Sequence, residues 1–239
     1  MTDDFSNDML PRPGEAIDPR ELARRDLQKS LPKRFYAQAG VEADGALFSL
    51  ALDGRRARTP ARNPLTVHSA ALAQALAEEW NAQREVIDPA TMPLTRLVHS
   101  ALDGVAREMD AVAADAAKYA GSDLLCYRAG DPASLVAEQA AAWDPVLDWM
   151  RAAHGARFVL AEGVMFAAQG EEALAAVRRL LDDLVRAGDG GETGAAMRLA
   201  SLHVMTTLTG SVLLALAVAS GFMDKEKAWA AAHVDEDFQ

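Results

Sequence analysis

The chain has 239 residues, half of them apolar and a quarter charged, so it is long enough to bury a sizeable core and has an ordinary globular composition. Its formal net charge of -11 argues against nucleic acid or an anionic membrane surface as a partner, because both are bound through clustered Lys and Arg. The single cysteine, Cys126, excludes an intrachain disulfide and indicates a reducing compartment. Its apolar neighbours predict a buried, unreactive thiol.

Residues 1–17 are polar and contain Pro and Gly, which predicts a flexible N-terminus. The start is acidic and has neither the apolar run of a secretory signal nor the Arg-rich pattern of a transit peptide. We therefore expect the protein to stay in the compartment where it is made. Asp18-Pro19 then predicts a short charged helix that extends to about Lys29.

Residues 35–67 carry the pattern of a small antiparallel meander. Asp44-Gly45 and Asp53-Gly54 are dipeptides typical of hairpin turns. Between them, large apolar residues alternate with smaller ones at Phe48, Leu50 and Leu52. The Leu65-Thr66-Val67 segment is predicted to pair as a further strand.

After Ser69, a good helix N-cap, the pattern is helical throughout. Leu72, Leu76 and Trp80 share one face of a first helix, which we expect to end near Gln83. A second amphipathic run follows Met92-Pro93 and carries an apolar stripe over residues 94–112. Further helices are predicted at 132–142, 145–153, 171–187, 195–221 and 225–235, where Asp131-Pro132 and Asp144-Pro145 begin the first two.

Strands therefore come first and helices follow, without alternation between them. This order predicts an α+β protein in which a small antiparallel β-containing domain, residues 18–112, precedes an all-helical C-terminal domain, residues 113–239.

Residues 199–223 contain no charged side chain and are long enough to span a membrane. Their first half carries hydroxyl side chains and His203, and the flanking Arg198 and Asp224 show no basic bias. We expect a central helix buried on all sides and no membrane insertion. A tail-anchored protein is the alternative.

The sequence contains no motif that calls for catalysis, a cofactor or a metal. The glycine-rich stretch from Gly188 to Gly194 follows a helix instead of a strand and lacks the spacing of a phosphate loop. The five histidines show no spacing that suggests a metal site, and His203 is predicted to bond Ser or Thr hydroxyls in the core. The acidic run Asp235-Glu236-Asp237 is interpreted as a solvated or partner-facing end. An enzyme with a site around His203 or this run is an alternative.

Several segments together resemble the family of chaperones that bind the alpha subunit of the catalytic head of F-type ATP synthase, the ATP synthase assembly factor 2 family of mitochondria and alphaproteobacteria. The matching segments run in family order over residues 33–239. They are Leu52-Asp53-Gly54-Arg55 with Thr59-Pro60, Glu79-Trp80 with Gln83, Thr91-Met92-Pro93-Leu94-Thr95, Ser122-Asp123-Leu124-Leu125-Cys126-Tyr127, Trp143-Asp144-Pro145 with Trp149, Gly210-Ser211, and Asp235-Glu236-Asp237-Phe238-Gln239. The family usually continues past this final Gln into a Trp-Gly segment.

The resemblance implies a chaperone that holds the free alpha subunit before it meets the beta subunit, with no cofactor and no nucleotide hydrolysis. It implies a bacterial cytoplasmic protein, with eukaryotic relatives in the mitochondrial matrix, and a monomer when free. The family's important acidic position maps onto Glu236, so client binding is expected at Glu236, Asp235 and Phe238. A structural role is expected for Trp80, Gln83, Pro93, Trp143, Asp144, Pro145 and Trp149. A generic binding module with another client is the alternative.

Overall fold

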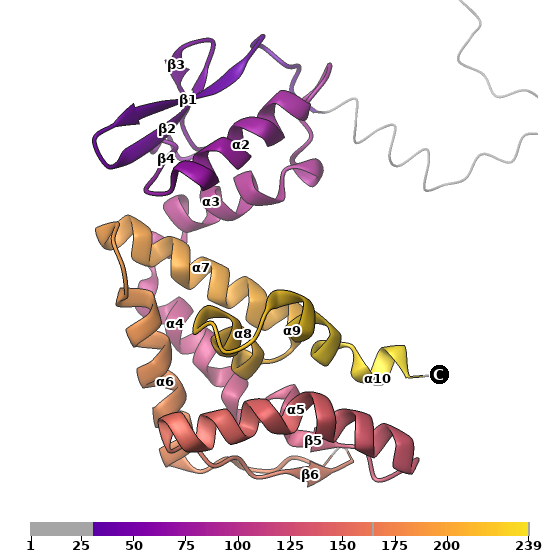
Figure 1. The fold of residues 1–239 in the computed structure, drawn as a ribbon. Coiled ribbons are helices and arrows are strands. Elements are labelled where there is room, and N and C mark those ends of the chain that lie inside the picture. The colour runs from indigo at the N-terminus through magenta and orange to yellow at the C-terminus, as the bar shows by residue number, and fades with distance from the viewer. Residues whose placement is uncertain (1–30, 164, 239) are drawn as a thin grey trace, which may run out of the picture.

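The computed structural model describes residues 31–163 and 165–238 and begins with a small antiparallel sheet (Figure 1). Its central strand, β2 (Leu47–Leu52), pairs with β1 (Ala39–Asp44), with β3 (Arg55–Arg56) and with β4 (Thr66–Val67). Both predicted turns are present: Gly45 has a φ of +61°, and Asp53 and Gly54 have φ values of 48° and 73°. These left-handed conformations are the ones that two-residue hairpin loops require.

Helix α2 (Ala70–Ala82) packs against the sheet, and helix α3 (Pro93–Asp103) packs against α2 (Figure 1). Ser69 caps α2, because its hydroxyl accepts a hydrogen bond from the Leu72 amide at 3.2 Å. Leu76 and Trp80 are buried on the predicted face and join Leu50, Leu65 and Val67 in one hydrophobic cluster. The predicted meander and the first helix are thus confirmed.

A carboxylate from α2 caps α3. Glu79 accepts hydrogen bonds from the backbone amides of Leu94, at 2.7 Å, and Thr95, at 2.8 Å, and also from the Thr95 hydroxyl. Gln83 accepts from the Asp88 amide and donates to the Thr91 hydroxyl, which fixes the 3-10 turn η1 (Pro89–Thr91) that leads into α3. Because a helix N-terminus has free amides, this contact holds the two helices together.

The predicted continuous stripe over 94–112 is wrong, because α3 ends at Asp103. Gly104 follows, then the 3-10 turn η2 (Val105–Arg107) and helix α4 (Met109–Lys118). The Asp103 carboxylate accepts hydrogen bonds from Thr59 and Asn63, which draws the helix end towards the sheet. The first hydrophobic cluster reaches Leu102, and a second begins at Val105. A domain boundary near residue 112 stays a prediction.

The C-terminal part is built around α8 (Val212–Ala219), in which every residue from 212 to 217 is buried. Helices α5 (Ala133–His154), α6 (Glu171–Arg186), α7 (Gly191–Thr209) and α9 (Lys225–Ala232) surround it, and α10 (Val234–Asp237) ends the described chain (Figure 1). The 3-10 turns η3 (Tyr119–Ser122) and η4 (Leu124–Cys126) lead into β5 (Tyr127–Arg128), which pairs in parallel with β6 (Ala161–Glu162). This two-residue pair is the exception to the predicted all-helical domain.

Three predicted helix boundaries are wrong. Residues 132–142 and 145–153 form the single helix α5, which passes through Pro145 because Trp143, Val146 and Met150 are all buried along its length. The predicted helix 195–221 divides at Gly210, whose φ of +67° ends α7. The predicted helix 225–235 divides at His233. In the described residues no helix combines the length and hydrophobicity of a membrane span.

The predicted flexible segment 1–17 and the helix from Asp18 to Lys29 lie outside the described residues.

We expect Trp80→Ala to lower the free energy of unfolding by about 3–5 kcal/mol, because it removes a buried indole from the first cluster. The Trp80 ring packs 5.5 Å from the Tyr36 ring, and the Tyr36 hydroxyl donates to the Trp80 carbonyl at 2.8 Å. Urea unfolding measures the change. Trp229→Ala is the matched control, since that ring is 53% exposed and its loss should cost less than about 1 kcal/mol. Equal effects of the two substitutions would contradict burial of Trp80.

Candidate functional site

The acidic end of the chain is a short helical turn beside α5. The His233 carbonyl accepts from the amides of Glu236, at 3.1 Å, and Asp237, at 2.8 Å. The Asp235 carboxylate accepts a 2.6 Å hydrogen bond from Gln139 on α5. Glu236 is 77% exposed, and its carboxylate lies 3.7 Å from His233 Nε2. Phe238 is half-buried. Asp235 is thus held by its hydrogen bond to α5, whereas the Glu236 side chain is exposed to solvent.

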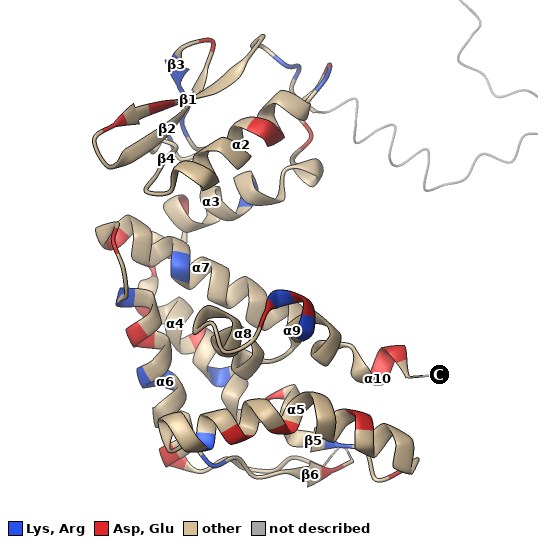
Figure 2. Ribbon diagram, in the orientation of Figure 1, with Lys and Arg blue, Asp and Glu red and all other residues tan. Residues whose placement is uncertain are grey.

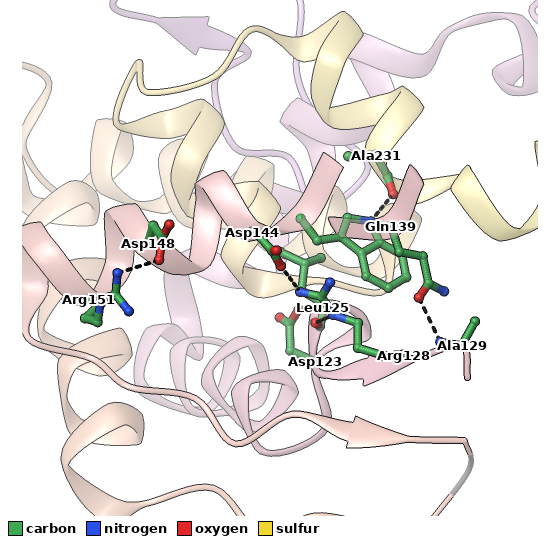
Figure 3. A network of polar contacts seen from close by, with 10 residues as sticks. Asp123, Leu125, Arg128, Ala129, Gln139, Asp144, Asp148, Arg151 and Ala231 are labelled. Carbon is green, nitrogen blue, oxygen red and sulfur yellow. Dashed lines mark hydrogen bonds and ion pairs between the residues drawn. The ribbon is translucent and has the colours of Figure 1, made fainter. Parts of the chain in front are cut away.

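Two side chains one turn apart on α5 hold this end of the chain in place. Trp143, which is fully buried, donates from its indole to the Ala231 carbonyl at 2.7 Å. Gln139 is also buried, and its carbonyl oxygen accepts from the Ala129 amide while its amide reaches Asp235. Figure 3 shows Gln139 between Ala129 and the segment that carries Ala231. The position of the acidic turn is therefore set by contacts with α5.

Arg128 contacts α5 through the Asp144 carboxylate and the Trp143 ring. Its guanidinium lies 2.7 Å from the Asp144 carboxylate, and its Nε donates to the Leu125 carbonyl at 2.9 Å (Figure 3). It also lies 5.1 Å from the centroid of the Trp143 ring, within reach of a cation–π interaction. The Arg128 side chain is only 14% exposed, so this pair is screened less than a surface salt bridge.

A buried carboxylate fixes the start of α8. Asp123 accepts hydrogen bonds from the Ser211 hydroxyl at 2.7 Å, from the Leu213 amide at 3.1 Å and from the Leu125 amide at 3.2 Å. The Ser211 hydroxyl in turn accepts from the Leu214 amide. Burial raises the pKa of Asp123 from 3.8 to about 6, although these hydrogen bonds act in the opposite direction. The carboxylate thereby fixes the turn that separates α7 from α8.

Next to this turn, α7, α8 and α9 enclose an apolar groove of about 130 Å³, called here the α7–α9 groove. Its lining residues are Met205, Leu208, Thr209, Leu214, Ala215, Val218, Lys225, Ala228 and Trp229. On its rim, Leu208 is 62% exposed and Trp229 is 53% exposed. A depression of about 230 Å³ lies elsewhere over residues 106–111, but one short stretch of chain lines it and its lining includes none of the predicted site residues.

The groove and the acidic turn are joined through one histidine. The Trp229 and His233 rings pack 4.1 Å apart, and His233 Nδ1 donates to the Trp229 carbonyl at 2.8 Å. Because the opposite nitrogen of His233 faces Glu236, the groove rim and the exposed carboxylate belong to one continuous surface.

A model of the ATP12 chaperone protein family matches residues 33–151. The solved structure of the Atu1473 protein from Agrobacterium tumefaciens is 48% identical to this chain, with a TM-score of 0.78 over 94% of this chain and 81% of the other. Atp12 from Paracoccus denitrificans, solved as such and as an aspartate-to-lysine mutant, is 40% identical with a TM-score of 0.75 over 87% and 85%.

The chain belongs to the ATP12 chaperone family. This family is the assembly chaperone of the alpha subunit of F1-ATPase. The resemblance of the sequence to this family is thus confirmed, and so is the α+β architecture predicted from the order of strands and helices.

Two further expectations about single residues have different outcomes in this ATP12-family protein. Burial raises the pKa of Cys126 to about 12, as expected of an unreactive thiol. The expectation for His203 is wrong, because its ring bonds the Asp115 carboxylate at 3.0 Å. The neighbouring hydroxyls do not reach it: Thr206 and Thr209 donate to backbone carbonyls four residues earlier in α7.

One histidine has an acidic partner one helical turn away. The prediction that no histidine has a carboxylate partner at metal-ligand spacing is wrong for His233, which has Glu236 three residues later with the two side chains 3.7 Å apart. Over the described ranges no group of three or more His, Cys, Asp or Glu side chains converges as a metal would need. Leu208 was not predicted as a surface residue because residues 199–223 were expected to be buried on every side, and Trp229 carried no motif that marked it. The one-turn spacing of Val204 and Leu208 beside the polar Thr207 was the available signal for an exposed face.

We expect the ionisation of Asp123 to make the free energy of unfolding depend on pH. Its pKa in the folded state lies above its value in the unfolded chain, so between about pH 4 and 6 the folded state binds more protons and stability falls as pH rises. Relative to Asp123→Asn, the natural protein should lose roughly 2 kcal/mol of unfolding free energy from pH 4 to pH 7.

Urea unfolding at each pH measures this difference. Asp224→Asn is the control with the opposite sign, because hydrogen bonds from Lys227 lower the pKa of Asp224, and that carboxyl favours the folded state at higher pH. A stability difference between the natural protein and Asp123→Asn that does not change with pH would contradict burial of the charge.

Proposed function

We propose that this protein binds the free alpha subunit of the F-type ATP synthase catalytic head, prevents its aggregation before it joins the beta subunit, and performs no chemical turnover. The observation that carries this proposal is family membership, which rests on the family model over residues 33–151 and on the Atp12 structure that matches 87% of this chain. We propose further that the protein acts in the bacterial cytoplasm and is a monomer when free. The bacterial sources of its solved relatives and its one buried thiol support the first of these statements.

Holding an unassembled subunit requires an exposed binding surface and not an enclosed pocket. A subunit that has not yet met its neighbour exposes apolar surface that assembly later buries, and such patches aggregate. A protein that holds it needs an interface that excludes water and dissociates when the true neighbour arrives. The α7–α9 groove and the acidic turn offer this combination of exposed apolar and charged groups.

Glu236, Asp235 and Phe238 are proposed as the client-binding residues of the acidic turn. Glu236 supports this role best, because its side chain is mostly exposed and its one ion pair among the described residues is with the half-buried His233. Asp235 contributes mainly by fixing the turn through Gln139, and the half-buried Phe238 follows it at the edge of the fold. A carboxylate at this place favours a client segment that carries Arg or Lys.

Co-purification with isolated subunits tests the proposal. The natural protein should form a complex with the alpha subunit, keep it in solution, and leave the isolated beta subunit unbound. Capture of another protein in preference to alpha would favour a generic binding module. Turnover of a small molecule by the purified protein would contradict the absence of catalysis.

We expect Glu236→Lys to weaken alpha-subunit binding about tenfold, because it reverses an exposed charge that meets the client. Thermal stability should stay within about 0.5 kcal/mol of the natural protein, since the side chain is exposed. Glu78→Lys makes the same charge change on the exposed face of α2, far from α10 (Figure 2), and should bind normally. The affinity is measured by titration calorimetry at low and high salt. A loss of stability instead of affinity would make Glu236 a structural residue.

A further inference from the structure

The α7–α9 groove combines exposure with a fixed shape. Leu208 and Trp229 are more than half exposed on its rim, whereas Leu214 and Ala215 at its base are fully or almost fully buried. The Asp123–Ser211 contact sets the turn between α7 and α8 that separates the two walls. The groove is thus formed before any partner arrives, which lowers the entropic cost of binding.

The volume of the groove suits one side chain. An apolar cavity of about 150 Å³ accepts a molecule of the size of benzene, so about 130 Å³ has room for a single aliphatic or small aromatic group. The lining is almost entirely apolar, and Met205 supplies a flexible thioether that adapts to the shape of its guest. Trp229 on the rim has the size and rigidity of an interface anchor.

The charges around the groove are unequal. At the start of α9, Lys227 pairs with Asp224 at 3.0 Å and Lys225 lies 3.6 Å from Glu226, so this end is close to neutral. At the other end of α9, beyond Trp229, the acidic turn begins (Figure 2). Within residues 31–163 and 165–238, Glu236 lies near only His233, and Asp237 has no ion-pair partner. The end next to Trp229 is therefore negative.

We infer that the α7–α9 groove is the anchor site for the client: it takes one apolar side chain from a surface segment of the alpha subunit, while an Arg or Lys of the same segment pairs with the acidic turn at Glu236. This inference rests on the proposed function and adds the site and the chemistry of the segment that occupies it. The Trp229–His233–Glu236 contacts connect the two halves of the site.

A second copy of this chain does not fit the site equally well. The net charge is -11, and a symmetric pair of chains would bring two acidic turns towards each other. A segment with one apolar side chain and a neighbouring cation satisfies both the groove and the carboxylate.

The test is a titration of the purified alpha subunit with Leu208→Ser, Trp229→Ala and Leu160→Ser, each at low and high salt. Leu160 is the matched control because it is 48% exposed on the segment after α5, away from the groove. Leu208→Ser and Trp229→Ala should each weaken affinity about tenfold or more, the effect of losing an interface anchor, and Leu160→Ser should bind normally. The loss should persist at high salt, whereas the loss from Glu236→Lys should shrink as salt screens the charge.

The outcomes separate the two proposals. If the natural protein binds alpha and both groove variants bind it equally well, the anchor site is refuted and the chaperone function stands. If the natural protein does not bind alpha, the proposed function fails as well. Circular dichroism of the free variants checks that they are folded, and sedimentation measures their oligomeric state. A natural dimer that Leu208→Ser converts to a monomer would assign the groove to self-association and overturn the inference.

Discussion

The buried carboxylate of Asp123 is the interaction on which the C-terminal half depends. It lies in the segment between α4 and α5, yet it binds the first residues of α8, about ninety residues later. Helix α8 is the buried centre around which the other helices pack, so its position sets theirs. The raised pKa of Asp123 shows that burying this charge is costly. The cost is partly offset because the same oxygens accept three hydrogen bonds from groups that would otherwise be unpaired.

In the N-terminal half, a carboxylate likewise accepts hydrogen bonds from the free amides at the start of a helix. Glu79 on α2 caps α3 through the amides of Leu94 and Thr95, and Gln83 fixes the turn between the two helices. Most segments that carry the family resemblance therefore contact a residue distant in the sequence. The contacts are Glu79 with Leu94 and Thr95, Asp123 with Ser211, and the Trp143 region with Arg128 and Ala231. In these pairs the motifs maintain the fold, and the proposed partner surface lies beside them.

The proposed binding surface is a product of these internal contacts. Trp143 and Gln139 hold α9 and α10 against α5, and the Asp123 cap sets α7 at an angle to α8. The groove opens where these constraints meet, with Leu208 and Trp229 on its rim and Glu236 beyond. A rigid surface with one apolar hollow and one exposed carboxylate is suited to reversible binding of a protein segment.

The sequence by itself determined the order of strands and helices, the two hairpin turns, the Ser69 cap and the burial of Cys126, because each follows from local periodicity or from a few adjacent residues. It also identified the family, because the family's motifs are recognisable as short runs of adjacent residues. It could not decide that Pro145 lies inside a continuous helix, that the charge-free run breaks at Gly210, or that His203 meets Asp115. It assigned Leu208 to the core, whereas the fold leaves that side chain on the surface. These features depend on which distant residues come into contact, and only the tertiary structure specifies those contacts.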